Sequence, residues 1–300
     1  MLHRLTHSPT GALATALERF GEQFYYPLGH GRRFKISHGH EYLRFFCAMG
    51  SATLFVVEEN GEVLGTLARV ERWLELPGQN PNRQMVHYLA DLKISPRARG
   101  RGVLAKIFGA AREQILGSSS RACYAIVMDG TDVLPIAYTG RLGIPVFEPL
   151  AKICILRVMT ESFAPQASPS IPLTLPAPTC IVSGGDRAAR SILSPQRIHG
   201  RAWLEDTRRA KRLWTEDGQE MISAHLGALY FKEPGTGIKL IEASLKEAHK
   251  VGISAMFFAV PESISPQICA GLADPVQAPA TIYGIGISAG LDWWVDTAEI

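Results

Sequence analysis

A short segment rich in arginine and glycine has the most specific chemical pattern in the sequence. Residues 97–102 read Arg-Ala-Arg-Gly-Arg-Gly, between a predicted strand that ends near residue 94 and a predicted helix that begins near residue 102. Glycine lets the backbone turn tightly and approach a ligand closely. The first N–H groups of a helix lack intrahelical partners and carry partial positive charge. This arrangement therefore predicts a binding site for a pyrophosphate.

Two common phosphate-binding motifs fit this segment poorly. Residues 100–105 match the dinucleotide pattern G-x-G-x-x-A, but that motif places its first glycine directly after a strand, and here five residues, including Pro96, intervene. No acidic residue stands about twenty positions on, where the sequence has Ala122–Ala125. The Walker pattern is absent because no Gly-Lys-Ser/Thr follows. A basic turn that binds nothing is the remaining alternative.

The elements around this segment follow a mixed α/β order. Apolar periodicity predicts helices over 11–24, 41–49 and 102–117, with a short helical stretch over 133–141. An Asn-Gly pair at 60–61 predicts a tight hairpin turn between two apolar strands within 52–70. Further strands are expected within 84–95, 122–128 and 151–159. The order α-α-β-β-β-α-β-α-β differs from a repeated βαβ ladder.

The arginine-glycine segment resembles the acyl-CoA motif of the GNAT N-acetyltransferase superfamily. Arg97-x-x-Gly100-x-Gly102 resembles the R/Q-x-x-G-x-G/A signature of that family, and residues 141–144 resemble its later L-G-F segment. The hairpin within 52–70 is similar to the second and third strands of the family, so the resemblance covers roughly residues 37–160. It implies the GNAT fold, acetyl-CoA as co-substrate and an amine as acceptor.

The resemblance also implies a set of residues that bind acetyl-CoA. The loop and the helix start would hold the pyrophosphate, the end of the preceding strand would hydrogen-bond the pantetheine arm through its backbone, and an aspartate stands where many members have an asparagine near CoA. These residues are Leu92, Lys93, Ile94, Arg97, Arg99, Gly100, Arg101, Gly102, Val103 and Asp132. No metal is expected.

The catalytic residues that the resemblance implies are only partly present. An amine that attacks a thioester must lose a proton, and the departing CoA thiolate must gain one. The strand glutamate of many members corresponds to Ala90, so Asp91 is the candidate base, with a structural carboxylate as the alternative. The family spacing Y-x-x-L-G falls on Thr139, so Tyr138, one residue earlier, is the candidate acid. Other candidates at strand ends are His87, Tyr88 and Tyr124, although residues of these types are more often packed or surface residues than catalysts.

A proline-rich stretch divides the chain into two parts. Five prolines between Glu161 and Cys180 predict an extended linker over 161–178, after a first domain over 1–160 and before a second over 179–300. The second part repeats the order of the end of the first: strands are expected within 221–231, 253–260, 280–288 and 292–296, and helices over 240–250 and 265–272. Lys232-x-x-Gly235-x-Gly237 resembles a degraded acyl-CoA motif. We therefore expect a tandem GNAT protein with a degenerate second copy.

Composition excludes several other classes of protein. The 300 residues include 31 basic and 28 acidic side chains, and a net charge of +3 is too small for a dedicated nucleic-acid binder. No apolar run reaches the roughly 18–20 residues of a membrane helix, and the first twenty residues lack the uninterrupted apolar stretch of a signal peptide, so none is expected. The five cysteines are widely spaced without a C-x-x-C, which predicts a reduced, cytoplasmic chain without a zinc site.

These patterns predict an α/β protein with a mixed sheet and the GNAT fold, duplicated in tandem. The expected activity is an acetyl-CoA-dependent N-acyltransferase that moves an acetyl group to an amine of a small molecule or peptide by direct attack. The departures at Ala90 and Thr139 leave an alternative open, a non-catalytic CoA-binding or interaction module on the same fold. The histidine-rich segment 30–42 is either a wall of the acceptor site or a solvated loop.

Overall fold

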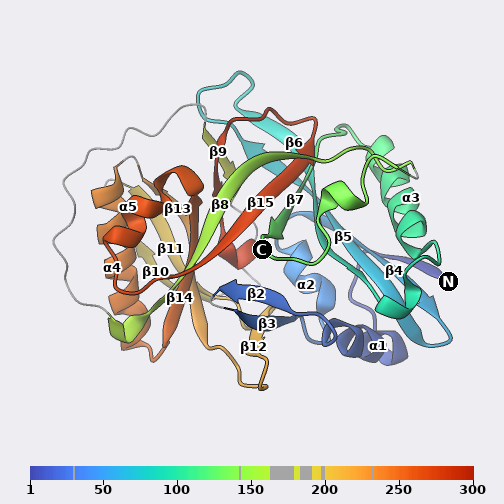
Figure 1. Cartoon of the computed structure of the whole chain (residues 1–300), viewed down its shortest axis with the longest axis horizontal. Helices are drawn as coiled ribbons and strands as arrows, with labels where there is room; N and C mark the ends of the chain where they lie inside the picture. The colour runs from blue at the N-terminus through green and yellow to red at the C-terminus, as the bar shows by residue number, and fades with distance from the viewer. Residues whose placement is uncertain (30, 142, 163–178, 183–190, 197–199, 232) are drawn as a thin grey trace.

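A computed structural model of the chain describes residues 1–29, 31–141, 143–162, 179–182, 191–196, 200–231 and 233–300 (Figure 1). Most of the predicted linker, residues 163–178, lies outside this part of the chain, as do Leu142 and Lys232 of the two motifs. The α-helices are α1 (Gly11–Gly21), α2 (Tyr42–Cys47), α3 (Val103–Leu116), α4 (Pro234–Lys250) and α5 (Ser265–Ala270). Short 3-10 turns include η1 (Pro96–Ala98), η2 (Pro135–Ala137), η3 (Thr160–Ser162), η5 (Glu262–Ile264) and η6 (Thr297–Glu299).

Most of the strands belong to a single mixed sheet. Those of the first half are β1 (Leu2–Leu5), β2 (Tyr26–Gly29), β3 (Arg32–Ser37), β4 (Ser51–Glu59), β5 (Glu62–Glu75), β6 (Arg83–Ile94), β7 (Cys123–Met128) and β8 (Glu148–Met159). Those of the second half are β9 (Thr179–Val182), β10 (Ser191–Gln196), β11 (Gly200–Asp206), β12 (Arg212–Thr215), β13 (Ser223–Phe231), β14 (Ala255–Pro261), β15 (Val276–Ile285) and β16 (Asp292–Val295).

The described residues form a 13-stranded sheet in the order β1-β4-β5-β6-β7-β15-β8-β14-β13-β11-β10, with β9 and β16 joined at the side of β5. A separate sheet of β12, β3 and β2 lies over its middle (Figure 1). The predicted mixed α/β class is therefore confirmed.

The two halves of the chain exchange strands at the centre of the large sheet. β15, from the second half, lies between β7 and β8 and is antiparallel to both. β8, from the first half, lies in turn between β15 and β14 (Figure 1). The succession β13-α4-β14-α5-β15 repeats β6-α3-β7-η2-β8 in chain order. The division into 1–160 and 179–300 stays a prediction, and these two ranges share one sheet.

The predicted hairpin is buried on both faces, because its side chains point alternately into two different parts of the core. Asn60 and Gly61 have φ values of +53° and +79°, as the expected tight turn requires. Along β4, Leu54 and Val56 pack in the core beside α1 and α2, whereas Phe55 and Val57 pack beside α3. Because helices cover both faces, the strand is apolar without interruption. The hairpin is the rigid support beside which β6 is placed.

Several predicted elements differ from the structure. α1 ends at Gly21, α2 covers only Tyr42–Cys47, and α4 begins at Pro234, ahead of its predicted start. The stretch 133–141 contains only the 3-10 turn η2, which Pro135 begins. Segment 30–42, for which a solvated loop is one of two interpretations, contains β3, whose apolar Phe34 and Ile36 line the cavity described below. Within the described residues, no helix combines the length and the apolar character that crossing a bilayer requires.

The strand exchange predicts that residues 1–160 do not fold alone. Without β15, whose Ala280 and Ile282 are fully buried, β7 and β8 become unpaired edges with exposed apolar faces. We expect this fragment to be unfolded or aggregated, and co-expression with 161–300 to restore a soluble complex. Circular dichroism melting of the fragment, the complex and the whole chain measures this. A monomeric 1–160 fragment with its own cooperative transition would contradict the structural argument.

Candidate active site

A gap opens in the large sheet where β6 and β7 separate. These parallel strands pair only at His87 with Cys123 and at Tyr88 with Tyr124. Beyond these pairs, β6 continues to pair with β5, and β7 continues to pair with β15. From Leu89 onward, the β7-facing edge of β6 therefore has no ladder partner among the described strands. Unpaired backbone N–H and C=O groups of this kind can bind an extended ligand as an added strand would.

A β-bulge at Asp91 lies within this free edge, two residues after its start at Leu89. Thr66 opposes Lys93 and Ala68 opposes Ala90, so β6 has one residue more than β5 over this stretch. Asp91 takes a left-handed conformation with φ of +54°, and the Thr66 hydroxyl donates to its carbonyl oxygen at 2.9 Å. A bulge bends and twists its strand. It therefore turns β6 away from β7 at the gap.

The Asp91 side chain lies in a buried polar cluster. Its Oδ1 is 2.6 Å from the Lys93 Nζ, and the Tyr42 hydroxyl donates to its Oδ2. The Lys93 Nζ also lies over the ring of Tyr26, 6.0 Å from its centroid. Burial opposes the charge of Lys93, but the Asp91 carboxylate holds the pKa of this lysine well above its ordinary value. Both Asp91 oxygens thus have partners, as expected for a structural carboxylate.

A cavity of about 220 Å³ passes through the gap. Four consecutive residues of β7, Ala125–Met128, all line it. Ala125 and Val127 pack on the α3 side of the sheet, whereas Ile126 and Met128 pack on the opposite side. Because neighbouring strand residues point to opposite faces, a cavity lined by all four crosses the sheet. Two reactants can therefore meet in it from opposite faces.

Tyr138 lines the part of the cavity that lies on the α3 side. It follows η2 directly, and its half-buried ring is 6.3 Å from the ring of Phe108 on α3. Burial, with a smaller effect of Tyr283, raises the pKa of Tyr138 to about 12, so its hydroxyl is protonated at neutral pH. Thr139, which the family spacing selects, also lines the cavity, but its hydroxyl accepts from the backbone N–H of Phe147 at 3.3 Å.

His38 lines the cavity just after the end of β3, and it belongs to the histidine-rich segment 30–42, for which a wall of the acceptor site is one of two interpretations. Its Nδ1 is 3.3 Å from the carbonyl oxygen of Ala210. Burial lowers the pKa of His38 to about 4, so its ring is neutral at neutral pH. Because a carbonyl only accepts, Nδ1 donates the hydrogen bond and Nε2 has the free lone pair. The ring stacks on Phe45 with a centroid distance of 4.8 Å, which fixes its orientation.

The predicted pyrophosphate loop has the geometry of an anion site. Gly100 and Gly102 have φ values of +77° and +73°, and a Cβ at either would meet no atom within 4 Å. α3 begins directly after Gly102 without a side-chain cap, which leaves its first N–H groups free for a ligand. Arg97 is 3.9 Å from Glu62, and Arg101 is 2.6 Å from Glu59. These side chains, like Arg99, are exposed at the surface.

The remaining predicted CoA residues take different positions. Leu92 lines the cavity, whereas Lys93 is buried in the cluster around Asp91. Ile94 packs in the core beside α3, together with Val103. Asp132 is exposed, although its neighbours on either side line the cavity. Of the predicted site residues, Asp91, Leu92 and Tyr138 thus line the cavity. The arginine-glycine loop over 97–102 is not part of its lining.

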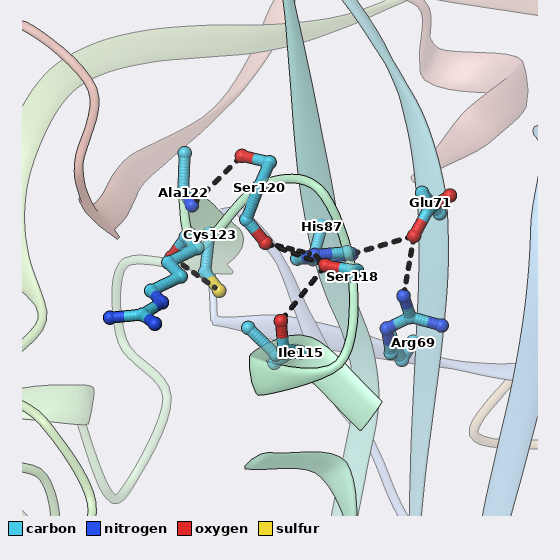
Figure 2. A network of polar contacts seen from close by, with 9 residues as sticks. Arg69, Glu71, His87, Ile115, Ser118, Ser120, Ala122 and Cys123 are labelled. Carbon is cyan, nitrogen blue, oxygen red and sulfur yellow. Dashed lines mark hydrogen bonds and ion pairs between the residues drawn. The ribbon is translucent and has the colours of Figure 1, made fainter. Parts of the chain in front are cut away.

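His87 is occupied in a structural network on β6 (Figure 2). Its Nε2 lies 2.8 Å from both the Ser118 hydroxyl and the Ser120 carbonyl oxygen. Its Nδ1 lies 3.8 Å from Glu71, which accepts a hydrogen bond from Arg69 at 2.7 Å. Burial lowers the pKa of His87. The network attaches the turn after α3 to the sheet, and His87 is not among the residues that line the cavity.

Tyr88 and Tyr124 support the base of the gap. Their rings stack at 4.8 Å, and Trp293 of β16 lies 5.3 Å from the Tyr124 ring. Burial raises the pKa of both tyrosines, and Tyr88 lines the cavity. The stack therefore fixes where the strands begin to separate.

The expected loop of the second half is replaced by a helix. β13 ends at Phe231, and α4 begins at Pro234, so Gly235 and Gly237 lie in its first turn. A Cβ at Gly237 would come within 2.5 Å of the Phe231 ring, so close packing explains this glycine. The ring of Trp294 packs on Phe231 with a centroid distance of 4.9 Å. The prediction of a loop here is therefore wrong, and the second copy is degenerate.

Among the solved structures that match the chain, two are similar to it over nearly its whole length. N-myristoyltransferase of Saccharomyces cerevisiae, solved with myristoyl-CoA and inhibitors, has a TM-score of 0.58 and 8% identity, over 94% of this chain and 80% of that chain. A tandem GNAT protein from the clavulanic acid biosynthesis pathway has a TM-score of 0.51 and 12% identity, over 95% and 98%. The chain therefore has the GNAT fold in a tandem arrangement. No protein-family model and no curated protein matches the sequence.

Proposed function

We propose that the chain is an acyl-CoA-dependent N-acyltransferase that transfers an acetyl group from acetyl-CoA to an amine. The observation that carries the proposal is the cavity that crosses the sheet between β6 and β7, directly beside a glycine loop at the start of α3. The GNAT fold of the chain supports it. Among the described residues, no group of three or more potential ligands is placed to bind a metal ion.

Acetyl-CoA would bind with its pyrophosphate on the loop and its pantetheine arm along the free edge of β6. The loop supplies the backbone N–H groups at Gly102 and Val103, and the arginines from 97 to 101 attract the phosphates. The amide groups of the arm would pair with the unpaired backbone from Leu89 to Ile94. The thioester would then lie at the Asp91 bulge, where the cavity crosses the sheet.

The amine would attack the thioester carbonyl from the face opposite α3. The nitrogen–carbon bond forms, the carbon–sulfur bond breaks, and one proton moves in net from the amine to the CoA sulfur. Tyr138, protonated and on the cavity wall, would protonate the thiolate. The His38 Nε2 would accept a hydrogen bond from the amine. Asp91, with both oxygens engaged, would act as a positioning residue that maintains the bulge.

The acceptor class and the place of action are proposed from the sequence. The acceptor would be a small molecule or peptide with a free amine, without a nucleic-acid or membrane partner. All five cysteines are free thiols, which favours the reducing cytoplasm as the place of action.

Replacing Gly102 by glutamate tests the loop. The positive φ favours glycine, and a carboxylate at the helix start would repel the pyrophosphate. We expect acetyl-CoA affinity to fall about tenfold or more in Gly102→Glu, as measured by calorimetry. Gly102→Asn is the matched control, because asparagine tolerates this conformation without adding charge. Wild-type affinity in the glutamate variant would remove the loop from the site.

Replacing Tyr138 by phenylalanine tests the proposed acid. Loss of a general acid lowers turnover by about a hundred- to ten-thousandfold. We expect this loss in Tyr138→Phe, with acetyl-CoA affinity unchanged, when thiol release is followed with a panel of amines. Tyr283→Phe, a change of the neighbouring tyrosine outside the cavity lining, is the control and should have little effect. Unaltered turnover in Tyr138→Phe would exclude its role. Tight acetyl-CoA binding by wild type without any thiol release would favour a non-catalytic module.

A further inference from the structure

The cavity is lined mainly by apolar side chains on the face opposite α3, and the histidine or charged side chains of His38, Asp91, Arg157, Lys211 and His225 also line it. β3 contributes Phe34 and Ile36, and the centre of the large sheet contributes Ile155, Phe257 and Ala278. Side chains of this kind bind an apolar body and leave few polar partners for a ligand. A charged side chain at such a wall therefore needs an explanation. Arg157, near the end of β8, is a charged residue that lines the cavity.

Arg157 has no charged partner among the described residues. Its register places it between Phe257 of β14 and Val276 of β15, and its guanidinium lies 5.9 Å from the centroid of the Phe257 ring. Its Nε is buried and has no hydrogen-bond acceptor. Within the part of the chain that the structure describes, no carboxylate lies within 4.0 Å of this arginine. A buried donor without an acceptor has a substantial energetic cost, which a ligand can remove.

Among the described residues that line the cavity, no charged side chain forms an ion pair with Arg157. Asp91 is the one side-chain carboxylate among the described cavity-lining residues, and Lys93 already neutralises it. The Lys211 Nζ, also on the cavity wall, donates to the Thr297 carbonyl oxygen and to a main-chain oxygen of Ile300, the last residue of the chain, both at 2.8 Å. Burial and the neighbouring Arg32 lower the pKa of Arg157. The guanidinium nevertheless stays charged, because its ordinary pKa is far above neutral pH.

We propose that the acceptor is an amine with an apolar body and a carboxylate, and that Arg157 binds the carboxylate. The apolar body would lie against Phe34, Ile155 and Phe257, and the amine would point to the thioester at the bulge. Arginine suits this role because its planar guanidinium can bind a carboxylate through two parallel hydrogen bonds. A hydrocarbon acyl tail would gain nothing from a charged wall. The proposal rests on the proposed function, since it names the acceptor class of that same site.

Matched pairs of amines test the proposal. Each pair shares its apolar body and differs only in the carboxylate: phenylalanine against phenethylamine, leucine against isopentylamine, and ω-amino fatty acids against alkylamines of the same length. Thiol release from acetyl-CoA gives kcat/KM for each compound, and calorimetry in the presence of CoA gives its affinity. In at least one pair we expect the carboxylate to raise kcat/KM about ten- to hundredfold, the range of a hydrogen-bonded charge.

Substitutions in β8 test whether Arg157 causes the preference for the amine that carries a carboxylate. Arg157→Met should abolish it, Arg157→Lys should retain part of it, and acetyl-CoA affinity should not change in either. Lys152→Met is the matched control, because Lys152 is exposed on the same strand and does not line the cavity. If Arg157→Met does not fold, the kcat/KM values of the wild-type protein for the two members of each amine pair decide whether the carboxylate is recognised.

The outcomes separate this proposal from the proposed function. Equal use of both members of every pair, or a preference that survives in Arg157→Met, overturns the assignment and leaves the acyltransferase intact. Acetyl-CoA binding without turnover or binding of any carboxylate compound also overturns it. Failure to bind acetyl-CoA at all overturns the proposed function itself.

Discussion

The candidate site depends on one constraint: the parallel strands β6 and β7 pair at two positions and then separate. Unpaired backbone groups inside a protein are costly, so the separation must be held open on both sides. On one side, the bulge at Asp91 turns β6, and the buried Lys93 and Tyr42 hold the carboxylate that accompanies it. On the other side, β15 pairs along the whole of β7 and draws it away. The free edge that results is where we place the pantetheine arm.

The same constraint explains why the two halves differ. β13 and β14 also pair briefly and then separate, and Ala228 has a φ of +49° near the end of β13, as Asp91 has in β6. In the second half, however, Asp296 and Trp294 pack on the diverging strand: a Cβ at Gly227 would come within 2.4 Å of the Asp296 carboxylate. α4 also starts without a glycine loop. The second half therefore supplies β15 and a wall of the cavity, and we assign acetyl-CoA to the first half.

Local patterns predicted the parts of this arrangement that local sequence determines. The Asn60-Gly61 turn, α3 and the glycines at positions 100 and 102 depend on residues close in sequence, and the structure has them as expected. The strand exchange was not predictable from the sequence. The apolar residues of β8 and β15 indicate that these strands are buried, but they do not indicate which strands lie beside them. Arg157 reaches the cavity through that tertiary pairing, and no motif marks it, whereas His38 belongs to the histidine-rich segment 30–42, for which a wall of the acceptor site is one interpretation. The alternation of apolar and charged residues over 32–37 could have indicated β3.

The central claim is that the chain has one acyl-CoA site, formed where β6 and β7 separate. Calorimetric titration of the whole chain with acetyl-CoA tests it most directly, because the stoichiometry counts sites without assuming an acceptor. The account predicts about one acetyl-CoA bound per chain, since within the described residues the loop and the open gap occur together only in the first half. Two sites of comparable affinity, or no binding at all, would contradict it.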